Sequence, residues 1–121
     1  MMEAPDEWMN RAERDLKTAN ANLGVGEHEA AAFFSHQAAE KALKALYIKR
    51  HNKLWKTHDL VGLISKLGHG GIENECELLN RHYIDTRYVV DLEYSREIAE
   101  SALKLAGKVV KWSRQKLKGE D

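Results

Sequence analysis

The sequence has little of what marks secreted, zinc-binding or membrane-inserted proteins. Its single cysteine, Cys76, cannot form an internal disulfide, and no Cys-x-x-Cys pair or Cys/His cluster indicates structural zinc. No apolar run approaches the roughly 18 residues that a membrane span needs. Residues 1–6 lack the basic start and apolar stretch of a signal peptide. We therefore expect a cytoplasmic protein without membrane association, metal or cofactor.

The chain also has only one proline and no excess of either charge. Its 19 Lys+Arg balance its 19 Asp+Glu, which excludes the uniformly basic surface of a general nucleic-acid binder. A hydrophobic content of 43% is too high for a disordered chain. The length of 121 residues suits one domain, so we treat residues 1–121 as a single unit.

Apolar residues recur at steps of three and four along most of the chain, a spacing that predicts helices. A first helix is expected to begin near Pro5, with Asp6 as its N-cap, and to end at residues 24–26. A longer, alanine-rich helix is expected over residues 27–50. After a polar loop, Thr57 is the expected N-cap of a short third helix.

The second half continues this pattern with two interruptions. Residues 68–71 form a glycine-rich break, and residues 72–83 return to helical spacing. Residues 84–94 have no helical period and are predicted to form a loop. Ser95 then caps a last helix that carries two apolar lines. The first line is Ala99, Ala102, Ala106, Val109 and Ser113, and the second is Ile98, Leu105 and Trp112.

Two apolar lines on one helix predict contact with more than one neighbour, either inside the bundle or across a dimer seam. Four substantial helices with short connections predict an all-α fold. The expected architecture is an antiparallel up-and-down four-helix bundle with one short extra helix.

Charge is unevenly distributed although its sum is zero. Residues 41–56 hold six Lys/Arg and no acid, and residues 101–119 hold six more without an acid. One interpretation is a set of solvated helix faces. The other is a local anion-binding surface for the phosphates of a nucleotide or RNA.

His36, Glu40 and Lys44 lie on successive turns of one predicted helix face. An imidazole and a carboxylate at this spacing can reach one ion, but a metal site needs a third ligand from elsewhere. The preferred interpretation is an i,i+4 ion pair between Glu40 and Lys44, which contributes about 0.3–0.5 kcal/mol when exposed. Cys76 is expected to be a small core residue.

Several segments, in this order, resemble the HEPN domain, a nucleotide-binding domain of higher eukaryotes and prokaryotes. They are Trp8-x6-Asp15-Leu16, the block Ser-His-Gln-Ala-Ala-Glu-Lys-Ala-Leu-Lys-Ala-Leu at 35–46, Thr57-His58-Asp59-Leu60, Tyr83-x3-Arg87-Tyr88 and the closing Ala/Val/Trp helix. The similarity covers nearly the whole chain. Its most specific part is the His-Gln-Ala-Ala-Glu-Lys block followed by Thr-His-Asp-Leu.

This resemblance implies a helical bundle that forms homodimers. Prokaryotic members are often encoded beside, or fused to, a minimal nucleotidyltransferase, and many such pairs are toxin–antitoxin systems. Active members are metal-independent ribonucleases with an Arg-x(4–6)-His motif. In that chemistry the histidine moves a proton at the ribose 2′-hydroxyl or the leaving oxygen, and the arginine stabilises charge on the phosphate.

The sequence departs from this ribonuclease motif. Arg87 is followed at the three allowed histidine positions by Leu92, Glu93 and Tyr94, and no other arginine has a histidine at the required spacing. His82 and His58 are the weak substitutes. We therefore expect no ribonuclease activity of the usual kind.

Arg87 between Tyr83 and Tyr88 is the main candidate for ligand binding, because a guanidinium grips a phosphate with two hydrogen bonds and a tyrosine ring stacks on a base. The alternative is that Arg87 pairs with Asp85 or Asp91 while the tyrosines cover the core. Further candidates for the same nucleotide or phosphate site are Gln37, Lys41 and Lys44.

Three hypotheses follow for function. The first is a non-catalytic nucleotide- or RNA-binding module that pairs, as a homodimer, with a minimal nucleotidyltransferase. The second is a degenerate ribonuclease toxin that uses His82 or His58 with Arg87. The third is a bundle that serves protein–protein interaction alone.

Overall fold

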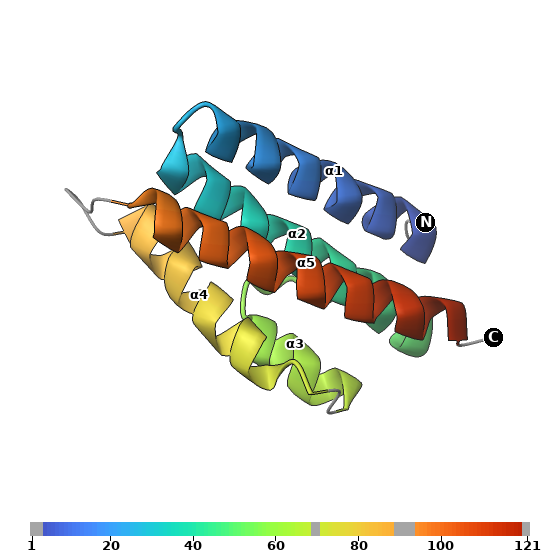
Figure 1. Cartoon of the computed structure of the whole chain (residues 1–121). Helices are drawn as coiled ribbons and strands as arrows, with labels where there is room; N and C mark the ends of the chain where they lie inside the picture. Colours follow the sequence, from blue (N-terminus) through green and yellow to red (C-terminus); the bar gives the residue numbers. More distant parts are fainter. Residues whose placement is uncertain (1–3, 69–70, 89–93, 120–121) are drawn as a thin grey trace.

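The computed structural model describes residues 4–68, 71–88 and 94–119, with the backbone alone at 83–88. Its helices, shown in Figure 1, are α1 (Pro5–Gly24), α2 (His28–His51), α3 (Leu60–Leu67), α4 (Glu73–Tyr88) and α5 (Arg96–Gly119). No strand occurs in these three ranges. The predicted all-α bundle with one short extra helix is confirmed.

Helix α2 is the central element, because it contacts each of the other four helices. Its buried alanines take up little space and allow close approach of neighbouring helices. They are Ala31, Ala32, Ala38, Ala39, Ala42 and Ala45, all fully buried. Helices α1 and α5 cover one side of α2, and α3 and α4 cover another (Figure 1).

The helix starts follow the sequence signals with two corrections. The N-cap of α1 is Ala4, not Asp6, because Pro5 has its backbone angle preset for the first helical position. The N-cap of α3 is Asp59, not Thr57. The Thr57 Oγ1 instead accepts a hydrogen bond from the Asp59 backbone N–H at 3.1 Å. The predicted cap of α5 is confirmed, since the Ser95 Oγ accepts a hydrogen bond from Ile98 N–H at 3.1 Å.

Helix α4 is longer than its apolar spacing predicts. The backbone at 84–88 is helical, so the predicted loop is wrong for these residues. The segment has no glycine or proline, and extending an existing helix adds one hydrogen bond per residue. Residues 89–93, which include Asp91, lie outside the described residues.

The two apolar lines of α5 differ in depth. Every member of the first line is buried in the bundle. In the second line, Leu105 and Trp112 are half-buried against the main core, whereas Ile98 is 41% exposed. Two members of the second line therefore also pack inside the bundle. Cys76 is fully buried, as predicted, and burial raises the pKa of its thiol to about 12.

No described helix combines the length and the apolar character that crossing a bilayer demands.

Candidate functional site

The carboxylate of Glu40, in the middle of α2, joins two sequence motifs that are far apart in the chain. Its Oε2 accepts a hydrogen bond from Lys44 Nζ at 2.9 Å, and its Oε1 lies 2.8 Å from His58 Nδ1. Glu40 is 4% exposed and Lys44 is 6% exposed, whereas the His58 side chain is 56% exposed. The carboxylate therefore lies inside the bundle and holds a histidine at the surface.

The predicted pair between Glu40 and Lys44 is confirmed, but it is buried rather than exposed. Burial changes its energetics, because removing two charges from water costs several kcal/mol per ion before their attraction is counted. Such a pair is stable only when each charge keeps its partner. The second contact of the Glu40 carboxylate, with His58, also ties the segment before α3 to α2.

His36 lies one turn before Glu40 and is fully buried. Its Nε2 lies 3.1 Å from the backbone oxygen of His58. His36 and His58 therefore both connect the segment before α3 to α2. Burial lowers the pKa of His36 below its usual 6.5, although the nearby Glu40 carboxylate opposes this shift. The described residues contain no group of three or more His, Cys, Asp or Glu able to hold a metal ion.

Asn80 on α4 completes the docking of this segment. Its Oδ1 accepts a hydrogen bond from Leu60 N–H at 2.9 Å, and its Nδ2 donates to Asp59 Oδ1 at 2.8 Å. Gly62 faces Asp59, where an added Cβ would lie 3.0 Å from the Asp59 Oδ2. The motif Thr57-His58-Asp59-Leu60 thus connects α3 to both α2 and α4. Sequence reasoning missed Asn80, because its spacing from other polar residues carries no signal.

Two of the predicted phosphate ligands take part in helix packing. Lys41 Nζ lies 2.5 Å from the Asp15 carboxylate on α1. Lys44 Nζ lies 5.9 Å from the centre of the Trp8 ring, in addition to its pair with Glu40. Gln37 is half-buried. The two lysines therefore already have protein carboxylates as partners.

The last turns of α4 carry the main ligand candidates. Tyr83, Arg87 and Tyr88 all have helical backbone, and Tyr83 and Arg87 are one turn apart. Their side chains lie outside the described residues, so their roles stay predictions. Nearby, the half-buried His82 has its Nδ1 3.2 Å from the Tyr94 hydroxyl, and the two ring centres are 5.7 Å apart.

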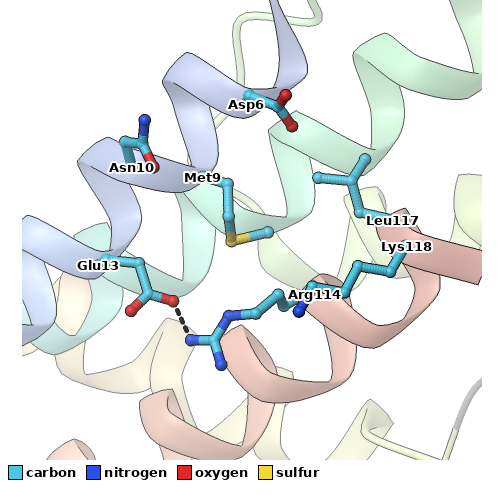
Figure 2. A pocket seen from close by; sticks show the side chains of 7 residues that line it. All are labelled: Asp6, Met9, Asn10, Glu13, Arg114, Leu117 and Lys118. Carbon is cyan, nitrogen blue, oxygen red and sulfur yellow. Dashed lines mark hydrogen bonds and ion pairs between the residues drawn. The ribbon is translucent and has the colours of Figure 1, made fainter.

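An open cavity of about 470 Å³ lies between the start of α1 and the end of α5 (Figure 2). It is lined by Asp6, Met9, Asn10, Glu13, Arg114, Leu117 and Lys118. Glu13 and Arg114 form an ion pair across it. In its described lining two acids match two bases, and none of the ligand candidates named above is among these residues.

Comparison with known proteins gives one family. The family model of the HEPN domain matches residues 5–116. A crystal structure of a protein from Thermus thermophilus shares 30% identity and a TM-score of 0.86, and the match covers 95% of this chain and 99% of that one. Curated proteins give no significant match.

Two further solved structures are similar. An archaeal HEPN homologue is 25% identical with a TM-score of 0.80, over 95% of this chain and 98% of that one. A HEPN domain protein from Thermotoga maritima is 23% identical with a TM-score of 0.76, over 93% of this chain and 98% of that one. The last similarity establishes the fold alone.

The buried pair predicts an asymmetric response to substitution. Glu40→Leu leaves the Lys44 ammonium buried without its carboxylate and should lower the free energy of unfolding by about 3–5 kcal/mol. Glu40→Leu/Lys44→Met removes both charges and should recover much of that loss. Urea unfolding followed by circular dichroism measures both variants. A double variant less stable than the single one would contradict this account of the pair.

Burial of His36 predicts a pH dependence of stability. Its pKa is lowered in the folded state, so the unfolded chain binds a proton first as the pH falls below about 6.5. The free energy of unfolding should therefore decrease between pH 7 and 5.5, by at most about 1.4 kcal/mol per pH unit from this group. His36→Gln should flatten the dependence measured by urea unfolding, whereas His51→Gln, at an exposed site, should keep it.

Proposed function

The chain belongs to the HEPN domain family, and from this premise we propose that it is a non-catalytic module that binds a nucleotide or RNA. In this proposal it acts as the homodimeric partner of a minimal nucleotidyltransferase in a toxin–antitoxin type system. One observation carries the non-catalytic assignment: the HEPN domain spans residues 5–116, yet no arginine in the sequence has a histidine after four to six intervening residues. The fold is kept without the proton-transferring residue that the ribonuclease reaction requires.

The binding site in this proposal is centred on Arg87. A guanidinium without the accompanying histidine still grips a phosphate through two charge-assisted hydrogen bonds. Tyr83 and Tyr88 supply rings for stacking on a base. Helical backbone at 83–88 supports the grouping, because it sets Tyr83 and Arg87 one turn apart.

The first experiment is a nucleotide titration. Arg87→Ala should weaken binding of ATP by about 10- to 100-fold, since a hydrogen bond to a charged group contributes about 1.5–3 kcal/mol. Arg81→Ala removes a nearby exposed arginine of the same helix and should leave the affinity unchanged. Isothermal titration calorimetry at two salt concentrations measures both variants, and the wild-type affinity should fall at the higher salt.

Outcomes of this titration separate the hypotheses. Equal ATP affinity in the wild type and Arg87→Ala would remove Arg87 from the site. If the wild type binds no nucleotide but co-purifies with the product of a neighbouring nucleotidyltransferase gene, the chain is an interaction bundle alone. Co-purification that persists in Arg87→Ala, together with the weakened ATP binding given above, is the expected result.

A specific contact favours one second candidate, a degenerate ribonuclease. His58 is exposed and its Nδ1 meets the buried Glu40 carboxylate. In the tautomer with hydrogen on Nδ1, the carboxylate fixes the ring and Nε2 is the proton acceptor. This is the arrangement of a general base that could take the proton of a ribose 2′-hydroxyl.

This candidate predicts RNA cleavage in the presence of EDTA. His58→Gln should abolish cleavage, and Arg87→Ala should reduce it, when purified protein is incubated with labelled RNA and the products are resolved by electrophoresis. His82→Gln serves as the matched control on α4. RNA that stays intact with the wild-type protein would end this alternative.

A further inference from the structure

The two acid-free basic segments of the sequence meet at one end of the bundle. Helices α2 and α5 both end where α1 begins (Figure 1). Between their ends lies an open cavity of about 440 Å³, lined by Arg50, Gln115, Lys116 and Gly119. A base from each segment therefore faces the same space, although the two are more than sixty positions apart in the chain.

The described lining of this cavity is basic. In the cavity of Figure 2, on the α1 side of α5, acids from α1 match bases from α5. Among the residues that the structure describes, the cavity between α2 and α5 is lined by two bases and no acid. Glu120 and Asp121, which follow Gly119, lie outside the described residues. Residues 114–118 of α5 thus contribute to two cavities. Among the described residues, one has equal numbers of acids and bases in its lining, and the other has bases alone.

Further bases extend this surface along the chain. Lys53 and Lys56 are exposed and follow the end of α2. The C-terminal end of a helix carries a partial negative charge that favours basic residues in the last turn. This effect alone can account for the presence of Arg50 and Lys116. That effect falls off within one turn and does not account for Lys53 or Lys56. Arg50 also donates a hydrogen bond to the Leu67 carbonyl, which fixes it beside α3.

Aromatic rings lie among these bases. The half-buried Trp55 has its ring centre 5.9 Å from that of Tyr47, and the exposed His51 ring lies 4.5 Å from Tyr47. On α5, Lys116 Nζ lies 5.7 Å from the centre of the half-buried Trp112 ring. Bases interleaved with rings are the features that bind single-stranded nucleic acid, because phosphates meet cations while nucleobases stack.

A membrane fits this surface less well. The exposed large hydrophobic side chains of the described residues are Val25, Val61, Leu78 and Ile98. None of them lies in residues 49–56 or 111–119. Insertion into a lipid surface needs such side chains next to the cations, whereas a phosphodiester backbone does not.

We propose that the end of the bundle formed by residues 49–56 and 111–119 binds single-stranded nucleic acid. Arg50, Lys53 and Lys116 contact phosphates, and the rings of His51 and Trp55 stack on bases. This surface goes beyond the Arg87 site, because the end of α4 meets the start of α5 at the opposite end of the bundle (Figure 1). Binding at each of the two sites can therefore be tested independently of the other.

The test is fluorescence anisotropy with the full chain and a labelled 12-nucleotide oligouridylate. Lys53→Glu/Lys116→Glu changes two exposed residues of this surface and should weaken binding by about tenfold or more at low salt. The slope of log affinity against log salt should decrease in magnitude by about 0.7 for each lost phosphate contact. Lys17→Glu/Lys104→Glu changes the net charge equally at exposed sites elsewhere and should cost less than about threefold.

Four results would overturn the proposal. They are no oligouridylate binding by the wild type, an equal loss in both double variants, loss of all binding in Arg87→Ala, and equally tight binding of polyglutamate or phosphatidylserine vesicles. An unchanged oligouridylate affinity in Arg87→Ala supports it. If the wild type binds no ATP, the Arg87 site is ruled out, but the oligouridylate result is unaffected. The two proposals are therefore tested separately.

Discussion

A carboxylate inside the bundle is the constraint on which much of this structure depends. Glu40 is 4% exposed and accepts contacts from Lys44 and His58 at 2.9 and 2.8 Å. A charge in such a place requires partners, because desolvation is costly. The partner from α2 satisfies one oxygen, and the partner from the segment before α3 satisfies the other. The need to satisfy one buried charge thus holds α3, and through Asn80 also α4, against the central helix.

The packing of α2 explains why function is expected at the ends of the bundle. Its middle is covered on nearly all sides and its alanines leave little room between helices. Lys41 and Lys44 look like ligand contacts in the sequence, but Lys41 joins α2 to α1 through Asp15, and Lys44 pairs with Glu40 within α2. Exposed cations lie at the end of the bundle where α2 and α5 stop, among them Arg50, Lys53 and Lys116. The net charge of the chain is zero, but its basic residues are clustered locally.

The two ends of the bundle differ in what they offer a ligand. One end carries the last turns of α4 with Arg87, and the other carries the ends of α2 and α5 with Arg50 and Lys116. In the first, a base is flanked by tyrosines in the sequence. In the second, bases from separate segments converge on a cavity whose described lining residues include no acid. An elongated anion suits such an arrangement better than a compact one, since the cations are spread over several turns.

The sequence by itself determined the helices, because apolar spacing of three and four depends only on local geometry. It also determined the Ser95 cap and the pair between Glu40 and Lys44, both of which involve residues three or four apart. The resemblance to the HEPN domain rested on the residues of the motifs and on their order along the chain, and the family model confirms it.

Tertiary structure alone decided the contacts between distant segments. That His58 reaches Glu40, that Asn80 docks α3, and that Arg50 and Lys116 share a cavity depend on which helices are neighbours. The helical continuation to Tyr88 likewise lacks a local apolar signal. Periodicity shows which face of a helix is apolar, but not which helix covers that face. The hydrophobic effect depends on the apolar area that is buried and has no preferred direction. Only packing of the whole chain selects the partner.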